Sequence, residues 1–523
     1  MKTLIYLLLA FVTVNECALN VLVYNIVFSH SHSRQTGLIA DILAQAGHNV
    51  TELVPLANKA EYKRKSKYVK EIVIEQNKEL GGLMDGGSMD ELNKALWVND
   101  PSPMAAMELF KNLTLMLSLQ CETSMQSEII EQLKGQKFDL AVCEVFDFCG
   151  YGLAEMIGVK TVIAYSTSIL LDHQALLLGI PRVPSYVPAS MGNTNEKMSV
   201  LQRASNAFSA FLGGNLFLGI ADAQTELFRK HIDPKFTDLQ ELVSRSALLV
   251  TNAIPLLDFP HPTLHKVISA GGMGQAVPKP LNEEWVKTVS TKPKTVLISF
   301  GSIAKSSFMS PAQKASIKQM AKDMPDVQFI WKYEEDDLKD LPANLLLSKW
   351  TPQSDLLASG KIDLFVTHGG LGSTTELAYS GIPAIVIPIM GDQPRNARML
   401  ERHGSAQYFS KFDLGSTGKL TALVTKMLND QSYKESAVKL ATILNNAPFK
   451  PQEVLLKNIE FVGKFGALPQ LDPYGRQLSF AQYFLVDIII YSILLVAFVI
   501  FAVFWAIRRC FRKVFQSGKS KSD

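Results

Sequence analysis

The sequence has little net charge and few charged residues. Lys and Arg total 52 and Asp and Glu total 49, which gives a formal net charge of +3. This balance gives no basis for nucleic-acid binding, which needs a concentrated basic surface. Charged residues make up 19% of the chain and hydrophobic residues 47%, so the composition excludes an intrinsically disordered chain. The length allows about two to four domains with a large buried core.

Cysteines and metal-binding motifs are also scarce. Five cysteines in 523 residues exclude a scaffold built on disulfides, and no Cys-x-x-Cys pair suggests a structural zinc site. The sequence contains no Asp-x-Asp, so it gives no sign of a diphosphate held by a metal ion. We therefore expect neither a metal nor a resident cofactor.

Residues 1–17 have the composition of a signal peptide. Lys2 is followed by an apolar run from Leu4 to Val14, whose 11 residues are too few to cross a bilayer core about 30 Å thick. The alternative interpretation is a first core strand. Glu16 interrupts the small-residue pattern of a cleavage site, so cleavage is expected only in the neighbourhood of Cys17.

A second hydrophobic segment, residues 488–507, contains 20 residues without a charge and is long enough to cross a membrane as a helix. Residues 508–523 include six basic residues and one acidic residue, so the positive-inside rule predicts a cytosolic tail and a luminal body. A buried soluble helix is the alternative. Lys519 and Lys521 resemble a dilysine retrieval signal, or form a solubilising tail. We expect a single-pass type I protein of the endoplasmic reticulum membrane.

A luminal body allows covalent modifications. Its three cysteines, Cys121, Cys143 and Cys149, permit one disulfide, but the sequence does not select the pair. Asn112 opens an Asn-Leu-Thr sequon and is a candidate for N-glycosylation. The sequon at Asn49 opens an apparent strand, and we expect it to be unmodified.

The body alternates strand-like apolar runs with helical patterns, which indicates parallel sheets covered by helices on both faces. One series lies in residues 18–260 and a second in 291–450, with a Pro- and Gly-rich linker at 261–290 and a return helix with a juxtamembrane segment at 451–480. The sequence predicts an α/β protein with two Rossmann-like, doubly wound domains facing across a cleft, and one C-terminal transmembrane helix. The predicted strands are Val21–Val27, Asn49–Pro55, Phe138–Cys143, Thr161–Tyr165, Leu248–Thr251, Thr295–Ser299, Val327–Trp331, Leu345–Lys349, Leu364–Thr367 and Ala384–Ile389.

The strongest functional pattern is a strand, a glycine-rich turn and a helix within residues 365–376. Glycines such as Gly370 let backbone N–H groups approach an anion, and a helix starting near Ser373 adds partial positive charge. His368 and Ser373 could donate to a phosphate, and Glu376 could accept from ribose hydroxyls. The pattern is neither a Walker loop nor the Rossmann Gly-x-Gly-x-x-Gly. A purely structural turn is the alternative.

Two further strand ends carry polar residues. Ser302 follows the strand Thr295–Ser299 and could reach the same phosphates. Asp392 and Gln393 follow the strand Ala384–Ile389, and an acid beside an amide suits a ligand with many hydroxyls. Asp392 can equally be a helix N-cap, and both interpretations can hold together.

Residues of this kind recur at fixed spacings in Trp350-Thr351-Pro352-Gln353, His368-Gly369-Gly370, Ser373, Glu376, Gly381-Ile382-Pro383, Pro388 and Asp392-Gln393. The pattern resembles the donor signature of the UDP-glycosyltransferase family, in its membrane-bound, UDP-glucuronosyltransferase-like branch. The resemblance implies the GT-B fold, in which the C-terminal domain holds the UDP-sugar. The contacts that it implies are Trp350 on uracil, Gln353 beside the base, Glu376 on the ribose, Ser302, His368, Gly370 and Ser373 at the diphosphate, and Asp392 and Gln393 on the sugar hydroxyls.

Two histidines, His30 and His32, follow the first predicted strand, and histidine is the usual base near neutral pH. In the family that the chain resembles, the catalytic histidine precedes the Gly-His at the end of the first helix by a fixed interval. That interval, 16 residues before His48, selects His32. The family pairs this histidine with an aspartate five residues before a cysteine, where this chain has Glu144. Asp147 is the alternative partner, and both carboxylates can instead cap the next helix.

The resemblance implies an inverting transfer of glucuronate or glucose from a UDP-sugar to a hydroxyl or acid of a small lipophilic acceptor, as in detoxification. Alternatives are transfer to a ceramide-type lipid and a catalytically dead UDP-sugar-binding protein of the same fold. The apolar stretches Leu170–Pro188 and Ala204–Ile220 are candidates for an acceptor pocket, with core packing as the equal alternative. Oligomerisation is possible, and no nucleic-acid partner is expected.

Overall fold

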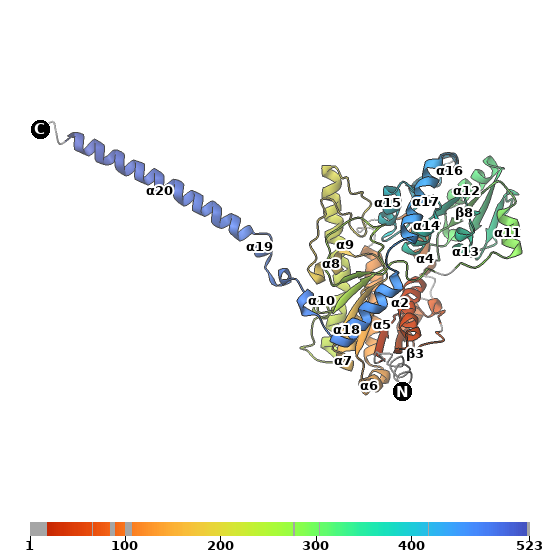
Figure 1. The fold of residues 1–523 in the computed structure, drawn as a ribbon, viewed down its shortest axis with the longest axis horizontal. Helices are drawn as coiled ribbons and strands as arrows, with labels where there is room; N and C mark the ends of the chain where they lie inside the picture. Colours follow the sequence, from red (N-terminus) through yellow and green to blue (C-terminus); the bar gives the residue numbers. More distant parts are fainter. Residues whose placement is uncertain are drawn as a thin grey trace, which may run out of the picture. The chain divides into compact units, whose positions relative to one another are not determined.

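The computed structural model describes residues 18–64, 66–83, 89–99, 107–275, 278–302, 304–416 and 418–519. The predicted signal peptide, Cys17 and Lys521 therefore lie outside the described residues. The chain forms two compact units, one that ends at Leu471 and one from Asp472 to Asp523 (Figure 1).

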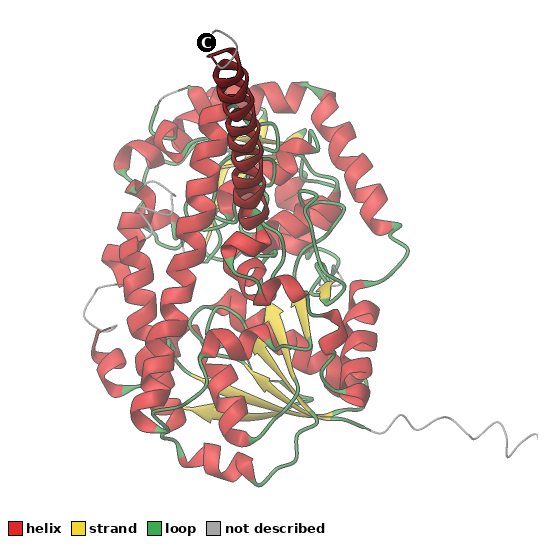
Figure 2. Cartoon of the chain, turned by 90° about the vertical axis from the view of Figure 1, so that its left-hand side faces the viewer, coloured by secondary structure: helices red, strands yellow, loops and turns green. Residues whose placement is uncertain are grey.

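The first unit contains two sheets in which all paired strands are parallel. Figure 2 shows the first sheet, in the lower half, as a twisted fan with helices on both sides. Its strand order is β3-β2-β1-β4-β5-β6-β7. Its strands are β1 (Asn20–Tyr24), β2 (Asn49–Pro55), β3 (Lys70–Ile74), β4 (Leu140–Glu144), β5 (Val162–Ser166), β6 (Leu248–Thr251) and β7 (Val267–Ser269).

The second sheet repeats this topology in the order β10-β9-β8-β11-β12-β13. In each sheet the order reverses between two central strands, β1 and β4 or β8 and β11, as in doubly wound folds. The prediction of two doubly wound domains is therefore confirmed. The strands are β8 (Lys294–Ser299), β9 (Val327–Lys332), β10 (Leu345–Ser348), β11 (Leu364–Thr367), β12 (Ala384–Val386) and β13 (Ala406–Tyr408).

Helices connect the strands and supply most of the remaining core. Those before β8 are α2 (His30–Gln45), α3 (Lys78–Leu83), α4 (Met89–Val98), α5 (Met107–Met125), α6 (Glu128–Lys134), α7 (Cys149–Ile157), α8 (Asp172–Leu178), α9 (Val200–His231), α10 (Leu239–Ser244) and α11 (Glu283–Val289). Those after β8 are α12 (Pro311–Asp323), α13 (Gln353–Ala358), α14 (Leu371–Ser380), α15 (Gln393–Arg402), α16 (Lys419–Asn429), α17 (Gln431–Asn445) and α18 (Pro451–Phe465).

The central strands are buried on both faces, which explains their continuous apolar sequence. Every residue of β4 is buried, including Glu144. Helix α2 begins at His30, soon after β1, so His32 lies in its first turn. The turn after the helix contains Gly47 with a φ of 96°.

Two segments beyond residue 260 belong to the half of the structure that contains the first sheet. The stretch 261–290, which we predicted to be a linker, contains strand β7 of the first sheet and helix α11. Helix α18 follows the second sheet but packs on β7 and α2, where Leu455, Ile459 and Val462 are buried.

The second unit contains α19 (Phe480–Tyr483) and the long helix α20 (Val486–Lys519). Among the described residues, two helices are long and apolar enough to cross a membrane, α9 and the part of α20 from Val486 to Lys513. Helix α9 packs against α5, α8 and α10, whereas no residue in the apolar window of α20 is buried. This C-terminal helix is compatible with the predicted span at residues 488–507.

Candidate active site

The strand ends at the reversal point of the first sheet bring His32 and Glu144 together. His32 follows β1 and Glu144 ends β4. Nδ1 of His32 lies 2.5 Å from Oε1 of Glu144. Thr167, which follows β5, lies 2.8 Å from the same Nδ1, and its hydroxyl donates to the same oxygen of Glu144 at 2.6 Å. Three strand ends thus form one hydrogen-bonded cluster.

The cluster determines how the imidazole is oriented. An ionised carboxylate only accepts hydrogen bonds, so Nδ1 carries the proton and Nε2 is left as the basic nitrogen. The ring packs between Phe28 and Phe146, with centroid separations of 4.6 and 4.5 Å. Glu144 is fully buried, whereas the side chain of His32 is partly exposed. A histidine held in this way can take a proton from a molecule that reaches Nε2.

Asp147, the alternative partner, points elsewhere. Its two carboxylate oxygens accept from Tyr24 at 2.6 Å and from Gln224 at 2.5 Å. Burial raises the pKa of Asp147 to about 6, against the lowering effect of these two hydrogen bonds. The structure therefore gives His32 a contact with Glu144, and it ties Asp147 into the core between β1 and α9.

Asp392 approaches this cluster from the second sheet. It directly precedes α15, yet its side chain makes no capping hydrogen bond. Its Oδ2 instead accepts from Asn396 at 3.1 Å and from Ser168, the neighbour of Thr167, at 3.2 Å. Burial raises the pKa of Asp392, opposed by those hydrogen bonds and by His32. The strand ends of the two sheets therefore meet at one place.

The reversal point of the second sheet holds the predicted phosphate turns. His368 follows β11, and Gly301 follows β8 with a φ of 81°. A Cβ at Gly301 would lie 2.8 Å from Cε1 of His368, and one at Gly370 would lie 2.6 Å from its Nε2. Both glycines are therefore needed for the imidazole to fit between the two turns. Ser302 is exposed beside them.

His368 is held neutral. Burial, with a contribution from Lys332, lowers the pKa of His368 to about 4. Its Nδ1 is buried and has no hydrogen-bond partner among the described residues. Nζ of Lys332 donates to the carbonyl oxygen of Gly301 at 2.5 Å, and burial lowers the pKa of Lys332. Lys332 is the last residue of β9, but the sequence did not predict its role, because a lone amine at a strand end forms no pattern.

Helix α14 begins at Leu371 and carries two of the predicted residues in its first two turns. Nε2 of Gln353 donates to Ser373 at 3.0 Å and to Glu376 at 2.5 Å. Ser354 donates to the other oxygen of Glu376 at 2.6 Å. The structure thus joins Gln353, Ser373 and Glu376 in one network, which leaves the free N–H groups of α14 at the same end.

Two other predicted residues differ sharply in exposure. The side chain of Trp350 is 76% exposed, so a flat aromatic face lies open beside α13. Gln393 is instead engaged in the turn, where its Oε1 accepts from the backbone N–H groups of Ile389 and Met390 at 2.8 and 3.0 Å. The amide nitrogen of Gln393 is the part of the side chain that can still donate to a ligand.

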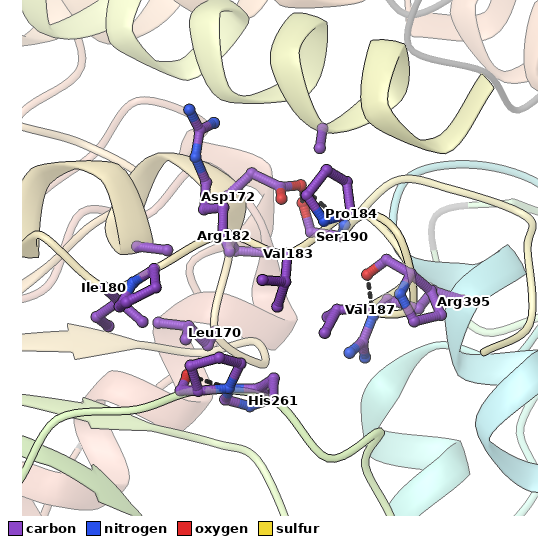
Figure 3. A pocket seen from close by; sticks show the side chains of 16 residues that line it. Leu170, Asp172, Ile180, Arg182, Val183, Pro184, Val187, Ser190, His261 and Arg395 are labelled. Atoms are coloured by element: carbon purple, nitrogen blue, oxygen red, sulfur yellow. Dashed lines mark hydrogen bonds between the residues drawn. The ribbon is translucent and has the colours of Figure 1, made fainter. Parts of the chain in front are cut away.

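A hollow lies between the region of α8 and α9 and the start of α15 (Figure 3). Leu170, Val183 and Val187 contribute apolar walls, and they belong to the first stretch that we proposed for an acceptor. Arg395 lines the hollow from the other half, and it pairs with Asp258 at 2.7 Å. The hollow therefore combines apolar walls with the charged residues Arg395, Arg182 and Asp172.

Covalent features complete the description. A disulfide joins Cys121 to Cys149, and Cys143 is a buried free thiol. Asn112 is exposed on α5, so its sequon is accessible. Within the described residues, no group of three or more His, Cys, Asp or Glu side chains is placed to hold a metal ion.

Comparison with known proteins gives a consistent result. A family model described as "UDP-glucoronosyl and UDP-glucosyl transferase" matches residues 19–521. The chain is 31% identical over 452 residues to "Putative UDP-glucuronosyltransferase ugt-56" of Caenorhabditis elegans, which covers 85% of each chain. It is 28% identical over 516 residues to UDP-glucuronosyltransferase 2B1 of Rattus norvegicus, which covers 94% of each.

Solved structures support the fold. The glycosyltransferase VinC in complex with DTDP superposes with a TM-score of 0.57 at 15% identity, covering 86% of this chain and 100% of that one. The spinosyn rhamnosyltransferase SpnG complexed with spinosyn aglycone superposes with a TM-score of 0.54 at 16% identity, covering 84% and 99%. These structures share the GT-B arrangement of two facing parallel-sheet domains.

Proposed function

Since this chain belongs to the family of UDP-glucuronosyl and UDP-glucosyl transferases and is a glycosyltransferase, we propose that it transfers glucuronate or glucose from a UDP-sugar to a small lipophilic acceptor. The acceptor group is a hydroxyl or a carboxylic acid, and the configuration at the anomeric carbon inverts. The observation that carries the proposal is the contact between His32 and Glu144, 2.5 Å long, at the strand ends of the first sheet.

The proposed reaction is a single displacement. Nε2 of His32 takes the proton of the acceptor hydroxyl, and the acceptor oxygen forms a bond to the anomeric carbon. The bond from that carbon to the diphosphate oxygen breaks, and UDP leaves with the electron pair. Glu144 keeps the imidazole in the tautomer that this step needs and stabilises the imidazolium that forms, as carboxylates do in catalytic triads.

The donor contacts follow from the polar groups of the second sheet. The N-terminus of α14, with Gly370 and Ser373, suits the diphosphate, and Ser302 and His368 lie beside it. Lys332 adds a positive charge at the same end of the sheet. We assign Trp350 to uracil, Gln353 to the edge of the base, Glu376 to the ribose, and Asp392 and Gln393 to the sugar hydroxyls.

The acceptor assignment rests on apolar surroundings. Phe28 and Phe146 flank the proposed base, and the hollow of Figure 3 has apolar walls. These features favour a lipophilic acceptor, as expected of a conjugating enzyme. The apolar helix α20 supports membrane attachment. We further propose a luminal catalytic body in the endoplasmic reticulum, a cytosolic tail and glycosylation at Asn112.

The test is sugar transfer by membranes that carry the full chain. UDP-glucuronate and UDP-glucose are each offered with a panel of phenols, carboxylic acids and a ceramide, and the products are identified by mass and anomeric configuration. The proposal predicts a β-linked product of at least one small acceptor. Transfer to ceramide alone would move the assignment to a lipid glycosyltransferase, and UDP binding without any transfer would indicate a dead binding protein.

A further inference from the structure

The end of helix α4 packs in the core of the second sheet, although α4 lies in the chain between strands β3 and β4 of the first (Figure 1). Leu96 and Trp97 are only 8% and 2% exposed. They belong to the same buried cluster as Phe300 and Met309 of the second sheet's half. The first half of the chain therefore supplies part of the core that supports the proposed donor site.

Two polar contacts anchor this helix end. The indole Nε1 of Trp97 donates to the carbonyl oxygen of Lys305 at 3.0 Å, and its ring meets Phe300 edge to face at a centroid separation of 5.2 Å. Nζ of Lys411, itself buried, donates to the carbonyl oxygens of Leu96 at 2.6 Å and Ile389 at 3.1 Å. A buried lysine thus ties the end of α4 to the segment after β12.

Both contacted segments lead directly into proposed donor turns. Phe300 precedes Gly301 and Ser302, which lie beside His368. Ile389 is one of the two residues whose backbone N–H groups donate to Gln393, in its case at 2.8 Å. One helix end therefore restrains two separate turns, and a turn that is already ordered loses less entropy when a ligand binds.

We propose that Trp97 is a positioning residue for the UDP-sugar, acting through the turn after β8. This inference rests on the proposed function, because that function assigns this turn to the UDP-sugar. Trp97 itself lies behind the turns and touches no reacting atom. Removal of its indole N–H leaves the Lys305 carbonyl without this partner and loosens the turn that carries Ser302. Donor affinity falls, while acceptor binding and proton transfer at His32 stay unchanged.

The decisive variant is Trp97→Phe, studied as the full chain in detergent. It keeps an aromatic ring against Phe300 but removes the indole N–H that donates to the Lys305 carbonyl. We expect the KM for the UDP-sugar and the Kd for UDP to rise roughly threefold to tenfold, the range set by one buried hydrogen bond. The KM for the acceptor stays within twofold. Trp97→Ala should raise the donor KM further.

Trp285→Phe and Trp285→Ala are the matched controls. Trp285 lies on α11 and packs on a different core cluster of the second sheet's half. These controls should lower Tm without changing the donor KM. A Trp97→Phe protein with a lowered Tm but an unchanged donor KM would overturn the inference, because α4 would then serve stability alone. Wild-type protein that neither binds UDP nor turns over would instead defeat the proposed function, and this inference with it. If Trp97→Ala fails to fold, Trp97→Phe decides.

Discussion

The two sides of the proposed active site are organised in opposite ways. On the first sheet, His32, Glu144 and Thr167 hydrogen-bond to one another, so the chain itself fixes the geometry of the imidazole. Beside the second sheet, Trp350 and Ser302 are exposed. The side chains bonded to Glu376 contact one another and leave the N-terminus of α14 open. The first arrangement suits a chemical step, and the second suits recognition.

This difference has a kinetic consequence. Interactions that matter only in the transition state change kcat, whereas groups that hold the ground-state donor change its KM. Substitutions in the first cluster should therefore act on kcat, and substitutions in the second on the donor KM. A substitution in the first cluster that changed only the donor KM, or one in the second that changed only kcat, would contradict this comparison.

The largest expected effect distinguishes Glu144, the last residue of β4, from Asp147, which follows that strand. Glu144→Gln should lower kcat by about 10²–10⁴-fold, because the carboxylate that orients and stabilises the imidazolium is lost. Asp147→Asn is the matched control. Asp147 bonds to Tyr24 and Gln224, so we expect at most a threefold loss of activity and a change in Tm. Steady-state kinetics on both variants checks this, and the reverse order of losses would make Asp147 the partner.

The next effect concerns the donor side. Trp350→Ala should raise the donor KM by about 10–100-fold with little change in kcat, because stacking of a base on an aromatic ring contributes about 1–3 kcal/mol. The exposed ring makes little contribution to folding, so Tm should hardly change. Phe412, also exposed in the second sheet's half, is the control position for loss of a surface ring. Equal donor KM values for Trp350→Ala and Phe412→Ala would show that Trp350 does not contact the UDP-sugar.

A smaller effect tests the third member of the first cluster. Thr167→Val keeps the shape but removes the hydroxyl that donates to Glu144. We expect kcat to fall roughly threefold to tenfold, the range of a typical net hydrogen-bond contribution of about 0.5–1.5 kcal/mol, with the donor KM unchanged. Thr167→Ser should restore most of the rate. A change confined to the donor KM would place Thr167 on the recognition side.

The last prediction concerns stability at acid pH and involves no change in catalysis. Burial lowers the pKa of His173 and of His368 to about 4 in the folded chain. The unfolded chain takes up these protons near pH 6.5, so each histidine costs up to about 1.4 kcal/mol of stability per pH unit as pH falls from 6.5 to 4. Asp147 opposes this loss below pH 6, because its raised pKa lets the folded state bind a proton first.

His173→Phe should therefore make the decrease in Tm between pH 6.5 and 4 smaller, since only His368 of these two buried, neutral histidines remains. The measurement is Tm against pH for the full chain in detergent. The variant is less stable at pH 7 because the contact of His173 with the Val145 carbonyl is lost. Parallel Tm curves for the variant and the wild type would contradict the assignment of a lowered pKa to His173.

Local patterns predicted the central strands well. The predicted ranges Asn49–Pro55, Leu248–Thr251 and Leu364–Thr367 agree with β2, β6 and β11 at both ends. Strands β3, β7 and β13 were missed. All three are edge strands and are short or partly exposed, so their sequences lack the continuous apolar run of a central strand.

The site was predictable only where residues occur in a motif. His32 and Glu144 were selected by the intervals that the resemblance to a known family implies, and the structure brings them into contact. Thr167 and Lys332 also stand at strand ends, but a lone hydroxyl or amine there forms no pattern. The docking of Trp97 on Phe300 joins residues far apart in the chain, and no local rule encodes such a contact.

The central claim is that His32 is the base of the reaction. It is tested by transfer from UDP-glucuronate and UDP-glucose to an accepted phenol, with membranes that carry the wild type or His32→Ala, while UDP binding is measured in parallel. Our account predicts that His32→Ala binds UDP with wild-type affinity and loses about 10²–10⁴-fold in kcat. Transfer at the wild-type rate by His32→Ala, with UDP bound normally, would contradict it.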